Sequence, residues 1–126
     1  MQVPPKYYDE IFHFTGIWDQ PSACGLKIAE KDGKKIVIVT ELYQDNPGTS
    51  VTTAGHSLAR QICEQKGYSL SEITYLECTP DTNSVLTFYS EHFFEVTWND
   101  ALKANYRKLS EEEVDDLFSS ATNCTN

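Results

Sequence analysis

The segment KDGKKIVIVTE, residues 31–41, decides the fold. Its Asp32-Gly33 dipeptide is typical of a tight hairpin turn and leads directly into a β-branched run. Because Ile36 to Val39 is continuously apolar, this strand should be covered on both faces and lie near the middle of a sheet. Before the turn, residues 24–29 alternate in the period-two pattern of a strand with one buried face. The sequence therefore predicts a β-hairpin at the centre of the fold.

A helix is predicted over residues 50–66. Residues 46–50, NPGTS, offer turn-forming side chains and capping hydroxyls before it, and Gly67 ends it. Val51, Ala54, Leu58 and Ile62 recur at helical spacing and form one apolar stripe, whereas Thr53, His56, Arg60 and Glu64 fall on the opposite side.

Further strands are expected at residues 11–18, 73–78, 85–89 and 93–98, and a turn at 19–22. A capping box, Ser110 with Glu113, predicts a short acidic C-terminal helix. The order βββαβββα indicates an α+β fold: a single-layer mixed sheet of about five to six strands with one central helix packed on it. No segment differs in composition from the rest, so residues 1–126 are expected to form a single domain.

The chain of 126 residues carries a formal net charge of -9, and five of its nineteen acidic residues lie within residues 111–116. The only basic cluster is Lys31, Lys34 and Lys35, so nucleic-acid binding is not expected. No apolar run is long enough to cross a bilayer, and residues 1–6 contain no signal-like segment. We therefore expect a soluble, cytoplasmic protein without a membrane partner.

The four cysteines, Cys24, Cys63, Cys78 and Cys124, lack the CxxC spacing of zinc and redox sites. We interpret them as mostly buried thiols, and we expect neither a metal nor a cofactor. Cys78 beside Glu77, with a histidine elsewhere, could form a thiol nucleophile and its base, but a cysteine in a strand is more often a small core residue. No recognised catalytic motif is present, so the sequence leaves open whether the chain is an enzyme.

A possible ligand site depends on how two strands are arranged. If residues 35–42 and 72–78 are neighbours in one sheet, the helix between them makes a right-handed crossover and the strands run parallel. The loops at 41–50 and 77–83 would then meet at the edge where ligands bind in open α/β sheets. The candidate ligand-binding residues there are Glu41, Asn46, Gly48, Thr49, Ser50, His56, Glu77 and Asp81.

Two ligands are conceivable at this edge. The helix N-terminus, with its unpaired amides, favours a phosphate, and Gly48 allows close approach of the backbone. The carboxylates Glu41, Asp45, Glu77 and Asp81 could hold a divalent cation that bridges to the phosphate. The alternative is structural: ordinary capping residues, a turn glycine and solvated acids. Strand alternation places Glu77 on the face of Ile73 and Tyr75, which is inward if that face is the core.

Two functions follow from these features. The acidic C-terminal helix could dock on a basic protein, although a solvated helix face is the simpler alternative. We expect a small acidic, non-enzymatic binding or regulatory protein that acts through a macromolecular partner. The rival hypothesis is a phosphate- or nucleotide-binding protein, or a metal-assisted hydrolase, with its site at the 41–50 and 77–83 loops.

Overall fold

The computed structural model describes residues 8–42, 48–80, 91–120 and 122–123. The elements follow one another in the predicted order βββαβββα, with a two-residue strand added at the end. They are β1 (Glu10–Thr15), β2 (Pro21–Lys31), β3 (Lys34–Thr40), α1 (Val51–Lys66), β4 (Ile73–Pro80), β5 (Glu91–Trp98), β6 (Ala104–Lys108), α2 (Glu111–Ser120) and β7 (Thr122–Asn123). The predicted α+β class is confirmed.

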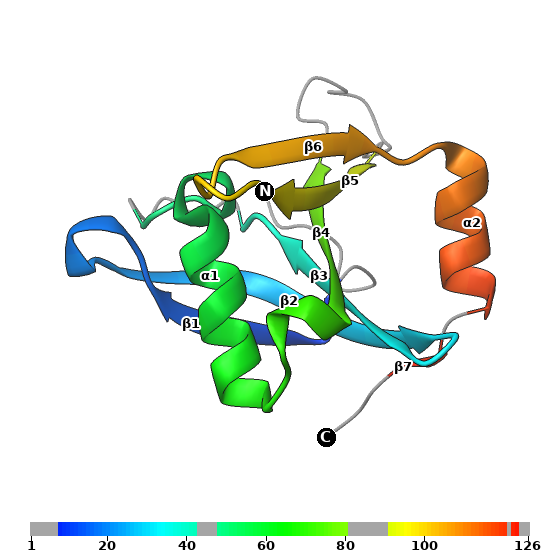
Figure 1. Cartoon of the computed structure of the whole chain (residues 1–126), viewed down its shortest axis with the longest axis horizontal. Helices are drawn as coiled ribbons and strands as arrows, with labels where there is room; N and C mark the ends of the chain where they lie inside the picture. Colours follow the sequence, from blue (N-terminus) through cyan, green and yellow to red (C-terminus); the bar gives the residue numbers. More distant parts are fainter. Residues whose placement is uncertain (1–7, 43–47, 81–90, 121, 124–126) are drawn as a thin grey trace.

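All strands belong to one mixed sheet in the order β1-β2-β3-β4-β5-β6, and β7 pairs with β2 beside this path (Figure 1). β3 and β4 run parallel, with register from Lys35 opposite Ile73 to Thr40 opposite Cys78. The other neighbouring pairs are antiparallel. The parallel pairing on which the predicted ligand edge depends is therefore present, and α1 is the crossover between the two strands.

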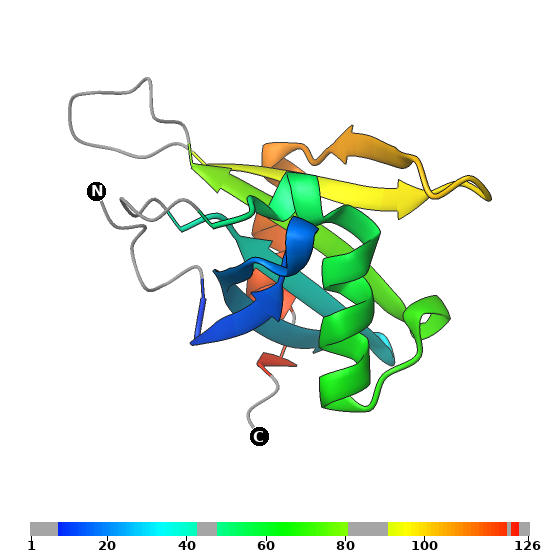
Figure 2. The same cartoon turned by 90° about the vertical axis from the view of Figure 1, so that its left-hand side faces the viewer.

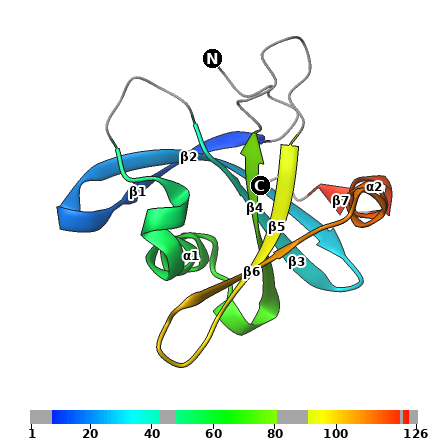
Figure 3. The ribbon, with the colours of Figure 1, turned by 90° about the horizontal axis from the view of Figure 1, so that it is seen from above.

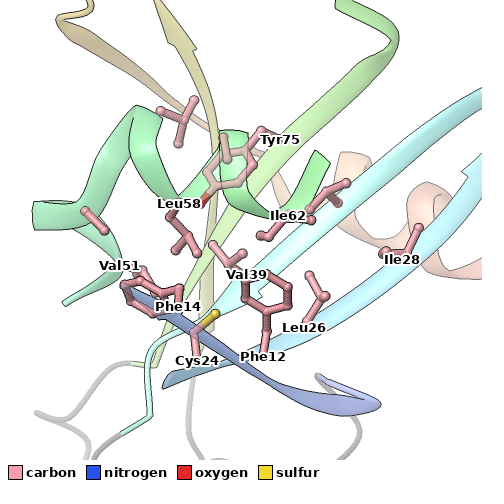
Figure 4. Close-up of a cluster of buried hydrophobic side chains, with 14 residues drawn as sticks. Phe12, Phe14, Cys24, Leu26, Ile28, Val39, Val51, Leu58, Ile62 and Tyr75 are labelled. Carbon is pink, nitrogen blue, oxygen red and sulfur yellow. The ribbon is translucent and has the colours of Figure 1, made fainter. Parts of the chain in front are cut away.

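The two helices lie on opposite faces of the sheet (Figure 3). On β3, Val37 and Val39 pack into the core beneath α1, whereas Ile36 and Ile38 belong to the second core cluster with Leu117 of α2. All four β3 residues are buried, as the continuous apolar run predicts. Figure 4 shows the larger core, in which aromatic and aliphatic side chains of β1 and β2 meet the apolar stripe of α1.

The turn between β1 and β2 differs from the prediction. The strand expected at 11–18 ends at Thr15, and residues 17–19 form a single 3-10 turn. Trp18 and Asp19 both have left-handed backbone angles, with φ of 58° and 56°. Because the Gly16 N–H donates to the Gln20 carbonyl at 2.7 Å, the loop closes before residue 21. The turn predicted at 19–22 is therefore wrong in its second half, which already belongs to β2.

Helix α1 begins one residue later than predicted, at Val51, ends at Lys66 as predicted, and has one unexpected break. The Ser50 hydroxyl accepts a hydrogen bond from the Thr53 N–H at 3.0 Å, and Gly67 ends the helix with a left-handed φ of 79°. Within the helix, Gly55 has φ 52° and ψ -129°, which is not helical. This geometry is open to glycine and strained for other residues. The chain is thus kinked after the first turn, although the sequence pattern predicts a continuous helix.

The C-terminal part contains two strands that the sequence did not indicate, β6 and the two-residue β7. All residues of β6 are exposed, so the pattern of burial that marks other strands is missing there. The strand predicted at 85–89 lies outside the described residues. The capping box of α2 is confirmed, because the Ser110 N–H donates to Glu113 Oε1 at 3.0 Å and the Glu113 N–H donates to Ser110 Oγ at 3.1 Å. No described helix is long and apolar enough to span a membrane.

Candidate functional site

A buried carboxylate lies at the predicted edge. Glu77, in the second half of β4, is only 2% exposed and shares the face of Tyr75, beneath α1. Its Oε1 accepts a hydrogen bond from the Thr52 hydroxyl at 3.1 Å, and its Oε2 lies 3.5 Å from the donating Tyr106 hydroxyl. Glu77 is thus held between the first turn of α1 and the edge strand β6.

Glu41 lies one residue beyond β3 and occupies the start of the helix. The Val51 N–H donates to Glu41 Oε2 at 2.8 Å, and the Thr53 N–H is taken by Ser50. Two of the amides that a phosphate would need are therefore satisfied by the chain itself. An anionic ligand would have to displace Glu41 and approach Glu77, so this geometry does not favour a phosphate.

Burial controls the protonation of this cluster. It raises the pKa of Glu77; the hydrogen bond from Thr52 acts in the opposite direction, and the charge of Glu41 raises the pKa further. Burial also raises the pKa of Glu41, which the hydrogen bond from the Val51 amide partly offsets. Two carboxylates in a poorly solvated place attract hydrogen-bond donors and cations rather than anions.

Burial keeps the Cys24 thiol and the Tyr75 phenol protonated at neutral pH, because it raises the pKa of both groups. Burial, with a smaller contribution from Glu41, raises the pKa of Cys24 to about 12, so its thiol stays protonated. Cys78 is fully buried in the core cluster of the α2 face, away from the face of Glu77, so the two do not form a nucleophile and base. Cys24, Cys63 and Cys78 are buried as predicted, and Cys124 lies outside the described residues.

The other predicted site residues divide into three groups. Thr49 is buried, and its N–H donates to Ser22 Oγ at 2.6 Å; the neighbouring Gly48 also lies against Ser22, so both pack on the start of β2. His56 contacts Trp98 edge to face, with ring centroids 5.3 Å apart, and lines a different cavity. Asn46 and Asp81, like Asp45, lie outside the described residues. Among the residues with described positions, no three His, Cys, Asp or Glu are grouped so that they could hold a metal ion.

The cavity of His56 is a cleft of about 550 Å³ between β4 and β5. Ile73, Thr74 and Tyr75 form one wall, and Val96, Thr97 and Trp98 form the other. No sequence pattern indicated this cleft, because it arises where two neighbouring strands separate and depends on their relative direction rather than on local composition. Its volume lies within the range of small-ligand pockets.

Two surface features are also candidate binding sites for a partner. Trp18 is 92% exposed and Ile17 47% exposed at the tip of the β1–β2 hairpin, at the opposite end of the molecule from α2 (Figure 1). On α2, Glu111, Glu112 and Asp115 are exposed and make no ion pair with any described residue, whereas Glu113 pairs with Arg107 at 3.0 Å.

The structure brings two of the four expected carboxylates, Glu41 and Glu77, to the edge of the two parallel strands. Sequence reasoning missed both the cleft and the exposed Trp18. Comparisons with models of protein families, with curated proteins and with solved structures find no match to the chain.

Proposed function

We propose that this chain is a small acidic binding protein, without enzymatic activity, that acts through a basic protein partner. The observation that carries the proposal is the exposure of Trp18. A tryptophan side chain is usually largely buried, and here it is 92% exposed on a turn whose left-handed residues hold it outward. Tryptophan, with tyrosine and arginine, is enriched among the few residues that dominate the binding energy of protein interfaces.

The charge of the chain determines the kind of partner. A net charge of -9 attracts a basic surface and increases the rate of encounter more than the final affinity. The exposed carboxylates Glu111, Glu112 and Asp115 on α2 contribute to this field. Trp18 therefore contributes contact energy, and the acidic residues contribute long-range attraction.

The partner can be trapped through Trp18 itself. We would replace Trp18 with the photoreactive p-benzoylphenylalanine, irradiate the protein in an extract of its source cells, and identify the crosslinked protein. The same replacement at Ile11, an exposed position on β1, is the control. A basic protein captured only from position 18 is the expected result; identical products from both positions, or none, would contradict the proposal.

Measurements on the purified partner then test the two roles. Trp18→Ala should weaken binding by about 2 kcal/mol, or roughly 30-fold in Kd, without loss of stability, whereas Ile11→Ala should change little. Neutralising Glu111, Glu112 and Asp115 together should slow association several-fold at an ionic strength of about 0.01 M, where the Debye length is about 30 Å and attraction reaches across the molecule to the Trp18 end, and it should flatten the salt dependence of the association rate. Neutralising Asp32, Glu72 and Asp100, which are exposed elsewhere, is the charge-matched control. Equal slowing by both triple variants would show that only net charge matters.

A further inference from the structure

The ladder between β4 and β5 ends before either strand does. β4 pairs with β3 from Ile73 onward, but its described pairing with β5 begins only at Leu76, opposite Glu95. Figure 2 shows β4 (green) and β5 (yellow) diverging from a common end. Tyr75 and Val96, each 2% exposed, close the narrow end of this V-shaped opening. The cleft of about 550 Å³ widens from there toward the start of β4 and the end of β5.

The wide end of the cleft is lined by apolar side chains that the protein covers only in part. Leu70, Ile73 and Trp98 pack against the core cluster beneath α1, yet each is only half-buried. Leu102, in the turn after β5, is 56% exposed. Its backbone lies in the left-handed region, with φ 60°, which is costly for a leucine. A ligand with an apolar body would complete the burial of these four side chains.

The rings around Trp98 leave space for a flat ligand. His56 meets Trp98 edge to face, at an interplanar angle of 81°, and the Tyr75 ring is tilted to it by 53°. The sequence pattern places His56 on the polar side of a continuous helix, but the backbone break at Gly55 directly precedes it. Neither ring is parallel to the indole, so no aromatic ring of the described residues stacks flat on Trp98. A planar aromatic molecule can therefore pack on it in the offset geometry that ring pairs prefer.

The polar groups of the cleft favour a ligand that accepts hydrogen bonds. Asn99 Oδ1 accepts from two backbone N–H groups of its own turn, at 2.9 and 3.0 Å. These bonds fix the side chain and leave its Nδ2 donor without a partner among the described residues. Lys34 also lines the cleft and makes no ion pair within the described part of the chain, whereas Glu95 is already paired with Arg107 at 3.1 Å. A carboxylate matches both an unpaired ammonium group and an amide donor.

We propose that this cleft binds a small planar aromatic molecule that carries a carboxylate. Its rings pack on Trp98 and Leu102, Lys34 supplies the opposite charge, and Asn99 supplies a hydrogen-bond donor. The net charge of -9 opposes an anion at long range. At 0.15 M ionic strength, however, screening limits such repulsion to about 8 Å, so the charges beside the ligand decide. This site is separate from Trp18 and does not rest on the function proposed above.

The probe is 2-naphthoate, and NMR of the two tryptophan indole N–H groups reports where it binds. Trp98 lies in the cleft and Trp18 at the hairpin tip, and Trp18→Phe assigns the two signals. We expect 2-naphthoate to shift the signal of Trp98 alone, with a Kd of about 1 mM or lower. The uncharged 2-naphthamide and the saturated decalin-2-carboxylate should each bind at least fivefold more weakly. No shift, equal shifts of both tryptophans, or equal binding of all three compounds would overturn the proposal.

Two variants with matched controls test the named contacts. Lys34→Gln should weaken 2-naphthoate at least fivefold and leave 2-naphthamide unchanged, whereas Lys108→Gln, at an exposed position outside the cleft, should change neither. Leu102→Asn, which suits a left-handed backbone, should weaken both compounds several-fold. Ile17→Asn removes an exposed apolar side chain elsewhere and should bind as the wild type does. The amide spectrum of each variant verifies its fold. Unchanged binding of 2-naphthoate by folded Lys34→Gln or Leu102→Asn would refute the assigned contacts.

Discussion

Replacement of Gly55 by alanine should destabilise the protein, although a continuous helix predicts the opposite. In a regular helix interior, alanine is more stable than glycine by roughly 1 kcal/mol. At Gly55 the backbone has φ 52° and ψ -129°, and an added Cβ would contact nothing within 4 Å. The penalty is therefore purely conformational, about 1–3 kcal/mol for a residue held in such a region. We expect Gly55→Ala to lower the free energy of unfolding by that amount.

Urea denaturation of Gly55→Ala and wild type measures this difference, and a matched pair at Ser57 gives the reference. Ser57 lies in the regular part of α1, where Ser57→Ala should be more stable than Ser57→Gly by about 1 kcal/mol. Both Ser57 variants lose the same hydroxyl, so that contribution cancels. Alanine should thus be favoured at 57 and disfavoured at 55. If alanine stabilises both positions equally, the kink after the first turn does not exist.

Three further outcomes follow from the buried and capping groups. Burial raises the pKa of Glu77 in the folded state above its ordinary value of 4.5. The stability that protonated Glu77 contributes is therefore fully present below pH 4.5, and it is lost as the pH rises through the folded-state pKa. Urea denaturation should therefore show the stability of Glu77→Gln, relative to wild type, increasing from pH 4.5 to 8; a constant difference would contradict the burial of the charge. Cys24, with a pKa of about 12, should react with iodoacetamide at pH 8 only as fast as the protein unfolds, and rapid labelling in native conditions would contradict its burial. Ser110→Ala should lower the free energy of unfolding by about 1 kcal/mol, measured by denaturation, because Glu113 loses its reciprocal cap; an unchanged midpoint would refute this role.

The candidate carboxylate site could be partly predicted from the sequence. Strand alternation grouped Glu77 with Tyr75, and turn chemistry placed Ser50 at the helix start. The occupation of the Val51 amide by Glu41 could not be predicted, because it depends on where the end of β3 meets the first turn of α1. That contact changes the expected ligand chemistry, since it places a carboxylate where a phosphate was expected.

Local patterns of a few residues determined the elements of this protein. The Asp32-Gly33 turn, the run from Ile36 to Val39, the caps of α1 and the capping box of α2 all appear in the structure because each depends on neighbouring residues and their immediate hydrogen bonds. Only the tertiary structure decided the exposed strand β6 and the cleft beside Trp98. β6 forms because β5 offers it an edge, and the cleft forms because β4 and β5 diverge after pairing. Both depend on how distant strands are oriented, which no short stretch of sequence encodes.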